Sequence, residues 1–170
     1  MSPRTLLPLL AALLAAAPAA AARAEWLGYR GEARDPSAGS LLYIEEHWLR
    51  EGGDGPAERV VVYRCPSGEA FARKRVDYAV SRLAPAFLLE DGRDGYLEGL
   101  LRAERGAELV VRRGNAEPER RARVDEAGLV ADAGFDEFIR SQWDRLVGGE
   151  SVELRFAIPA RQDAMRFRVR

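Results

Sequence analysis

A histidine and a nearby glutamate are the residues whose types and spacing could do chemistry. His47 is the only histidine in the chain, and Glu45 precedes it by two positions. Residues two apart on a strand share one face, so this pair could begin a metal site or an acid–base pair. A histidine-assisted nucleophile would have to use His47, but no serine lies in a Gly-x-Ser-x-Gly segment. A hydrolase therefore competes with a simpler interpretation, in which both side chains lie on the polar face of an edge strand.

Metal and phosphate sites find little support in the sequence. Cys65 is the only cysteine, so the chain can form no internal disulfide and offers too few soft ligands for zinc. Acidic residues cluster at 90–94 and 132–137, but without the spacing of a calcium loop. We therefore predict a non-enzymatic protein with no metal, no cofactor and no catalytic residue. We interpret Cys65 as a thiol without a role at the end of a strand.

Aromatic side chains suggest a different kind of site. They could line an apolar cavity between a sheet and a helix, or they could form an ordinary core, and the sequence leaves both interpretations open. The first interpretation predicts an apolar or lipid-like small molecule as a partner. Its candidate ligand-binding residues are Tyr43, Trp48, Tyr96, Phe138 and Trp143.

Residues 132–147 are predicted to form the one long helix. Phe135, Phe138, Ile139, Trp143 and Leu146 recur at helical spacing and make one apolar stripe. The carboxylate of the first residue could cap the first turn, and an ion pair is expected between positions 136 and 140. The glycines at 148 and 149 end the pattern, since glycine accepts the left-handed conformation of a C-cap.

The rest of the chain reads as short strands separated by turns. Alternating or continuous apolar patterns bounded by glycine, proline and acidic residues predict about nine or ten of them. The segments are 25–34, 40–50, 57–65, 69–78, 87–89, 95–101, 108–113, 120–125, 151–158 and 165–170. We therefore predict a mainly β (α+β) fold, in which a curved antiparallel sheet or half-barrel packs on the single helix in the C-terminal half.

The N-terminal residues have the pattern of a cleavable signal peptide. Arg4 precedes an apolar run at 6–17, and Ala22-Arg23-Ala24 fits a cleavage site. The run is shorter than the ~20 residues that a membrane span needs. We predict a signal peptide over 1–24, a single β-rich domain over 25–170, and a periplasmic or secreted protein without a stable membrane span after cleavage.

The charge balance argues against a nucleic-acid partner. Loss of Arg4 and Arg23 with the leader changes the formal net charge from −1 to −3. No basic excess then remains to hold a phosphate backbone.

Three segments carry a resemblance to a known family. Residues 43–47, 94–99 and 132–136 resemble landmarks of an uncharacterised family of exported bacterial β-rich proteins that contain a domain of unknown function. The resemblance covers most of 25–170 and implies no catalytic residue. It also implies that C-terminal strands follow the position of Arg170. By architecture alone, the layout is similar to the half-barrel of the outer-membrane lipoprotein carrier and receptor.

Two functions thus lead over the hydrolase. The first is an exported protein that binds an apolar or lipid-like ligand or an envelope partner. The second is an envelope interaction or structural module that adds a strand to a partner's sheet, with the last strand and its outward arginines as the edge. The sequence does not choose a ligand, a partner or an oligomeric state.

Overall fold

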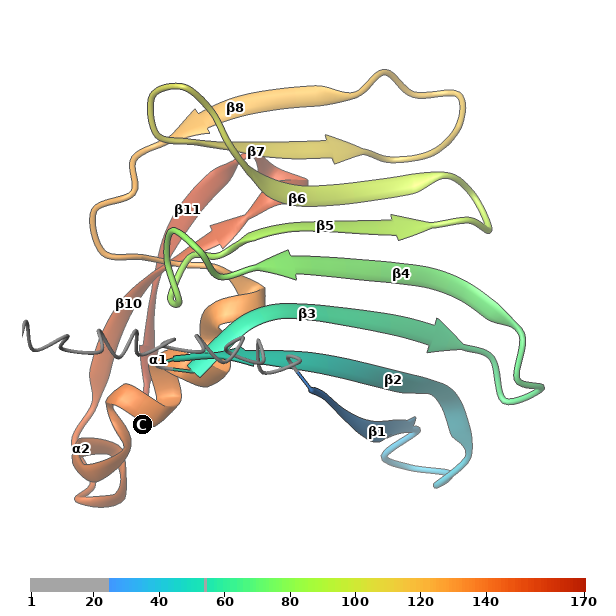
Figure 1. Ribbon diagram of the computed structural model, residues 1–170, viewed down its shortest axis with the longest axis horizontal. Helices are drawn as coiled ribbons and strands as arrows, with labels where there is room; N and C mark the ends of the chain where they lie inside the picture. Colours follow the sequence, from blue (N-terminus) through green and yellow to red (C-terminus); the bar gives the residue numbers. More distant parts are fainter. Residues whose placement is uncertain (1–24, 54) are drawn as a thin grey trace, which may run out of the picture.

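The computed structural model describes residues 25–53 and 55–170, and a large antiparallel sheet makes up most of them (Figure 1). Eight strands follow one another in the sheet in the order of the sequence, each paired with the next. They are β1 (Trp26–Arg34), β2 (Leu41–Gly52), β3 (Gly55–Arg64), β4 (Ala70–Asp77), β5 (Ala86–Asp91), β6 (Tyr96–Arg102), β7 (Ala107–Arg112) and β8 (Arg120–Val124).

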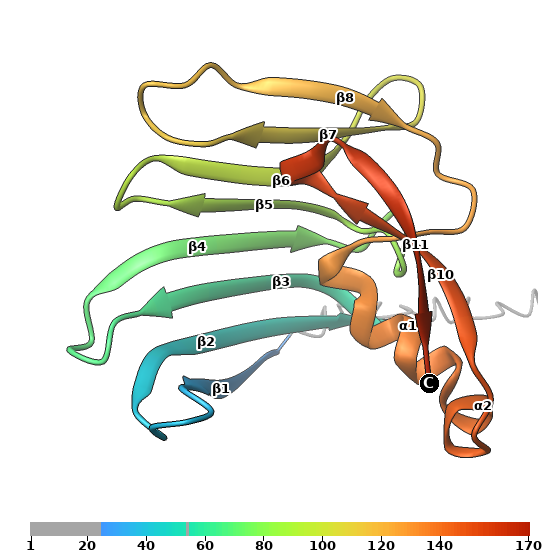
Figure 2. The same cartoon turned by 180° about the vertical axis from the view of Figure 1, so that it is seen from behind.

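A second, smaller sheet and the helical segment lie together on one face of the large sheet, near one end of its strands (Figures 1 and 2). In the small sheet β10 pairs in parallel with β9 and antiparallel with β11. The remaining elements, in chain order, are β9 (Leu129–Val130), η1 (Asp132–Gly134), α1 (Phe135–Ser141), α2 (Trp143–Val147), β10 (Val152–Ile158), η2 (Pro159–Arg161) and β11 (Asp163–Val169).

The predicted fold class is confirmed. The chain is mainly β, the large sheet is antiparallel and not closed, and the helical segment lies in the C-terminal half. All ten predicted strands have counterparts within a few residues of their predicted bounds. Only β9 was not predicted, because two residues carry no alternation that a pattern could reveal.

The register of the large sheet places a row of apolar side chains under the helix and the small sheet. Val76, Phe87, Leu100 and Leu109 occupy neighbouring positions on β4, β5, β6 and β7. All four are buried and pack in one cluster with residues that include Ala131 and Ala133. We call the face that carries this row the inner face, and the opposite face of the large sheet the outer face.

The helical segment differs in detail from the single helix predicted over 132–147. It begins as the 3₁₀ turn η1 and is interrupted at Gln142, between α1 and α2. The predicted cap was wrong: Asp132 makes no capping bond, because its carboxylate accepts a hydrogen bond from Lys74. Gly149 adopts the left-handed conformation, so the predicted glycine stop is confirmed.

Two further expectations about this segment were wrong. Arg140 pairs with Glu137 rather than with Asp136, whose carboxylate lies 3.5 Å from the guanidinium of Arg59 on β3. Trp143 is 59% exposed, whereas the other four members of the predicted stripe pack in an apolar cluster with the small sheet. The stripe therefore loses Trp143, while Leu146, which also follows the interruption at Gln142, keeps its place in the cluster.

Close backbone approaches hold the helical segment on the large sheet. The N–H of Ala131 donates to the carbonyl of Leu83 over 2.8 Å, and the hydroxyl of Tyr78 donates to the carbonyl of Ala133 over 3.0 Å. A Cβ on Gly134 would lie 2.1 Å from the oxygen of Leu83, so only glycine fits this contact.

The predicted signal peptide over 1–24 lies outside the described residues. Within the described ranges, none of the helices combines the length and the apolar character that a membrane span requires.

Candidate functional site

The inner face continues beyond the part that the helical segment covers. Toward the other end of the strands, the next row of neighbouring residues runs from His47 through Val61 and Lys74 to Leu89. The row after that contains Glu45, Tyr63, Ala72, Asp91 and Tyr96. The inner face therefore has two ends. We call the part under the helical segment and the small sheet the covered end, and the part that carries these further rows the open end.

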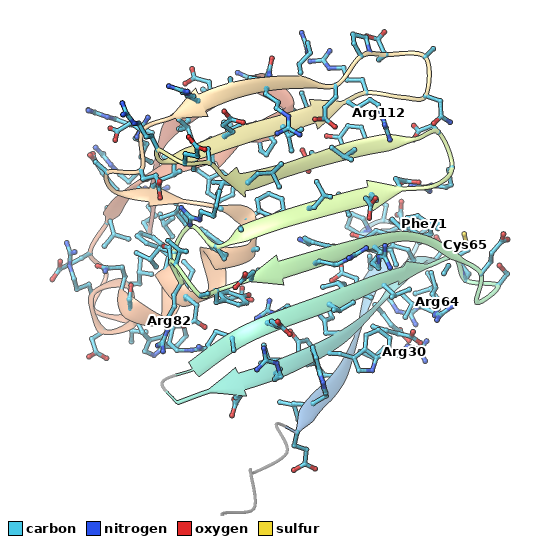
Figure 3. The ribbon with its side chains drawn as sticks, turned by 45° about the horizontal axis from the view of Figure 1, so that its top comes forward. Arg30, Arg64, Cys65, Phe71, Arg82 and Arg112 are labelled. Atoms are coloured by element: carbon cyan, nitrogen blue, oxygen red, sulfur yellow. The ribbon has the colours of Figure 1, made fainter. Side chains whose placement is uncertain are left out.

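Three aromatic rings gather at the open end. Tyr43 on β2, Tyr63 on β3 and Phe71 on β4 form a triangle, with ring centroids 6.1 to 6.4 Å apart. They border a cavity of about 300 Å³, which we call the aromatic cleft. Its lining residues are Leu42, Tyr43, Tyr63, Cys65, Phe71, Ala72, Leu89, Asp91 and Arg93. Figure 3 shows Phe71 and Cys65 at the same end of the sheet.

An irregularity in the pairing of β3 and β4 brings Phe71 into this cluster. Tyr63 pairs with Ala72 and Arg64 with Ala70, so Phe71 has no partner in the register. Strict alternation would turn its ring to the outer face, away from Ala72. A β-bulge leaves one residue unpaired and redirects its side chain, and here it allows the ring to reach Tyr43 and Tyr63.

An arginine closes one side of the aromatic cleft. The guanidinium carbon of Arg93 lies 3.9 Å from the ring centroid of Phe71, at cation–π distance. The Nε of Arg93 donates to Asp91 over 3.0 Å, and this hydrogen bond holds the pKa of the Asp91 carboxyl below its ordinary value. A charged pair therefore stands at the rim of an otherwise aromatic and apolar cavity.

A second polar group separates the aromatic cleft from the helical segment. Lys74 Nζ lies 2.5 Å from a carboxylate oxygen of Asp132, and it also interacts with the hydroxyl of Tyr63. Burial lowers the pKa of Lys74, but the two partners outweigh burial and leave the pKa above its ordinary value. Burial also raises the pKa of Tyr63. Lys74 thus stays charged and links the sheet to η1.

His47 and Glu45 do lie together, as the sequence predicted for residues on one strand face. His47 Nε2 is 3.0 Å from Glu45 Oε2, and the imidazole ring stacks on Tyr29 with centroids 4.4 Å apart. The His47 side chain is 13% exposed, and its Nδ1 has no hydrogen-bond partner in the described part of the chain. Its polar contact is therefore the carboxylate alone, which can orient an imidazole but supplies no nucleophile.

The five predicted ligand-binding residues lie in five different places. Tyr43 lines the aromatic cleft, and Tyr96 lies on the inner face opposite Asp91, where its hydroxyl donates to Glu98 over 2.8 Å. Burial, followed by this bond, raises the pKa of Tyr96. Trp48 pairs with Val60 on the outer face, whereas Phe138 is buried in the apolar cluster of the small sheet. Trp143 is exposed on α2.

Several residues of the aromatic cleft were missed at the sequence level. Tyr63 and Leu89 could have been found, because each shares a strand face with another inner-face residue two positions away. Phe71 was among the aromatic residues considered for such a cavity, but its orientation could not be predicted, since no sequence pattern marks the bulge that turns its ring. Arg93 lies in the turn between β5 and β6, and its contact with Phe71 joins segments that are distant in sequence.

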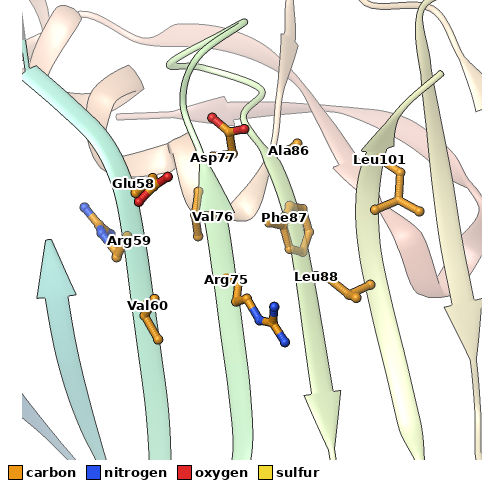
Figure 4. Close-up of a pocket in the computed structure, with 10 residues that line it drawn as sticks. All are labelled: Glu58, Arg59, Val60, Arg75, Val76, Asp77, Ala86, Phe87, Leu88 and Leu101. Atoms are coloured by element: carbon orange, nitrogen blue, oxygen red, sulfur yellow. The ribbon is translucent and has the colours of Figure 1, made fainter. Parts of the chain in front are cut away.

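A second hollow lies mainly on the outer face and has a different character (Figure 4). Its volume is about 370 Å³, and its outer-face lining combines aliphatic side chains such as Val60, Leu88 and Leu101 with Glu58 and Arg75. Phe87 is the one aromatic residue of the lining, and its ring belongs to the buried core. This hollow therefore lacks the partly exposed rings that make the aromatic cleft a candidate site.

Neither a metal site nor a similarity to a known protein points to a function. In the described residues, no three side chains of His, Cys, Asp or Glu gather closely enough to hold a metal ion. Comparison of the chain with protein-family models, curated proteins and solved structures gives no match.

Proposed function

We propose that the protein is a non-enzymatic binding protein of the periplasm that holds an apolar or lipid-like ligand in the aromatic cleft. The observation that carries this proposal is the triangle of Tyr43, Tyr63 and Phe71 at the uncovered end of the inner face. Three rings from three adjacent strands present apolar area at a low cost in conformational entropy, since each side chain has only two torsions to fix.

The rim of the cleft suggests a ligand with one polar end. A cavity of about 300 Å³ suits a small molecule or one segment of an acyl chain. Arg93 and Asp91 line it and could meet a carboxylate, hydroxyl or ester group. Each methylene transferred from water into such a site contributes ~0.8 kcal/mol, so the chain would supply most of the affinity.

Export is the second part of the proposal. Its support is the pattern of residues 1–24, in which a basic start, an apolar run and small residues precede the β-rich domain. A carrier of an apolar molecule is useful in an aqueous compartment between two membranes. An envelope protein is a second partner that we propose, and it is favoured by β11, which among the described strands pairs with β10 alone.

A hydrolase is a weaker proposal on this geometry. The pair of His47 and Glu45 could take up a proton, but among the described residues His47 Nε2 contacts no hydroxyl or thiol that it could activate. The neighbouring row positions on β1 and β3 hold Tyr29 and Val61. We therefore assign His47 a structural role beside the edge strand.

The experiment is native mass spectrometry of the protein isolated from its own periplasm. The mass of the bare chain would identify the cleavage site, and a species that dissociates as a lipid or another apolar molecule would support the proposal and name the ligand class. The double variant Tyr63→Ala, Phe71→Ala should carry no ligand when it is isolated in the same way. Trp143→Ala, which removes an exposed ring far from the cleft, should keep the ligand. Equal occupancy in both variants would remove the ligand from the aromatic cleft.

A further inference from the structure

Strand β11 has a free edge. The small sheet has the order β11-β10-β9, so among the described strands β11 pairs with β10 alone. Half of the backbone N–H and C=O groups of an edge strand point away from its neighbour and can bind another extended segment. Edge strands that avoid pairing are short, bulged or covered, whereas β11 runs for seven residues in unbroken register with β10.

The helix-side face of the small sheet is incompletely covered next to this edge. Leu154 and Phe156 on β10 lie against α1, and Phe156 meets Phe135 edge-to-face with ring centroids 6.0 Å apart. Phe167 on β11 continues the same apolar face but is 45% exposed. An apolar groove of about 270 Å³ runs here, lined by Phe135, Leu154, Phe156, Phe167, Arg168 and Val169. A fourth strand beside β11 would cover the exposed part of this face.

The opposite face of β11 is basic. Arg166 and Arg168 alternate with the apolar residues and therefore lie on the opposite face of the strand, although Arg168 also borders the groove. Arg168 pairs with Glu153 over 2.9 Å, whereas Arg166 makes no ion pair with the residues that the structure describes. Opposite charges on directly paired strands stabilise a sheet, and like charges destabilise it. The face thus favours acidic side chains on an incoming strand.

The same charges count against a second copy of the chain as the occupant. Two β11 strands paired antiparallel around Phe167 would set Arg166 of one copy opposite Arg168 of the other. Pairing around Arg166 would set that arginine opposite itself. Both of these registers keep the apolar residues on one face, and both bring arginines together.

We propose that β11 receives a fourth strand from a partner protein, supplied by an extended segment in which apolar and acidic residues alternate. The apolar residues lie beside Phe167 and close the groove, and the acidic residues lie beside Arg166 and Arg168. This interaction surface is separate from the aromatic cleft and does not depend on the proposed ligand.

The test measures fluorescence anisotropy of labelled eight-residue peptides added to the full chain. A peptide that alternates valine with glutamate should bind, whereas a peptide that alternates valine with lysine, a block-ordered peptide of the same composition and a version N-methylated at alternate residues should not. Arg166→Glu should exchange the preference between the glutamate and lysine peptides, and Phe167→Lys should abolish binding. The double variant Tyr63→Ala, Phe71→Ala should bind the peptide as the unchanged chain does.

Other results would overturn the proposal. Binding that is indifferent to peptide order or to N-methylation would show that no strand forms, and loss of binding in the cleft variant would place the peptide elsewhere. A doubled mass in sedimentation that Phe167→Lys reduces to a monomer would make a second copy the occupant. If the protein isolated from its source carries residues after Arg170 and binds no peptide, the chain itself covers β11.

Discussion

The two ends of the inner face use the same strands but have different surroundings. At the covered end, Leu100 and Leu109 are fully buried beneath the segment that contains Ala131 and Ala133. At the open end, Tyr63 and Phe71 are only partly buried, and no described helix or strand packs over the cavity that they line. Strand alternation thus defines which side chains share a face of the sheet. The segment that packs on that face then decides which of them become core and which stay accessible to a ligand.

The largest loss of stability is expected at the covered end. Leu100 is 0% exposed and lies in the middle of the core row. Leu100→Ala should lower the free energy of unfolding by about 2–5 kcal/mol, because it removes buried methyl groups and leaves a cavity. Urea unfolding followed by tryptophan fluorescence would measure the change. A loss below about 1 kcal/mol would mean that this end is no better packed than the open one.

The contact that holds the covering segment in place should be nearly as sensitive. Gly134→Ala would drive a methyl group into the carbonyl of Leu83, which cannot move without breaking its bond to Ala131. We expect a loss of about 1–3 kcal/mol, as for overpacked sites. Hydrogen exchange of the Ala131 amide should also accelerate. Stability equal to that of the unchanged chain would show that the covering segment docks more loosely than the structure indicates.

A smaller loss is expected from the buried hydroxyl between the two layers. Tyr78→Phe removes the bond to the Ala133 carbonyl and should cost about 1–2 kcal/mol, because the carbonyl stays buried without its donor. Burial raises the pKa of Tyr78 to about 12, so its neutral form is favoured by folding. The stability that this preference contributes is fully present below the ordinary tyrosine pKa of ~10. It is lost as the pH rises toward 12.

The difference in unfolding free energy between Tyr78→Phe and the unchanged chain should therefore narrow from pH 10 to 12. Urea unfolding of the two proteins across this range measures it. A constant difference would contradict the assignment of the shifted hydroxyl to Tyr78.

Substitutions at the open end should weaken ligand binding more than they lower the free energy of unfolding. Phe71→Ala is expected to cost less stability than Leu100→Ala, since its ring is only partly buried. It should weaken binding of decanoate, an apolar probe with one carboxylate, about tenfold or more, which corresponds to ~1.4 kcal/mol. Trp143→Ala should leave the affinity for decanoate unchanged. It should change the free energy of unfolding by no more than about 0.5 kcal/mol. Calorimetric titration and urea unfolding of both variants would make the comparison.

The sequence predicts most of the fold and part of the site for physical reasons that can be named. Apolar and polar residues alternate in segments such as 151–158 because one face of the strand is buried and the other is exposed. The strands and their faces could therefore be predicted from the sequence. The pair of Glu45 and His47 followed from the same rule. The contacts of Arg59 with Asp136 and of Lys74 with Asp132 join residues more than fifty positions apart. No local pattern encodes such contacts.

The unpredicted parts are those that depend on packing or on local irregularity. Trp143 has the spacing of a core residue, but it lies exposed on α2, after the interruption at Gln142. Trp48, in contrast, could have been excluded from the sequence alone, because it lies an odd number of positions from Tyr43 on β2 and therefore lies on the outer face. Phe71 reaches the aromatic cleft through a bulge, whose position depends on how β3 and β4 pair.

The most direct test of the aromatic cleft uses its own thiol. Cys65 is the only cysteine in the chain and lines the cleft, where it is partly exposed. The rate at which N-ethylmaleimide alkylates Cys65 should fall as decanoate is added, in proportion to its measured occupancy. The fall should disappear in Phe71→Ala and in urea. An alkylation rate that is unchanged while decanoate is bound would place the ligand elsewhere and contradict the central claim that the open end of the inner face is a binding site.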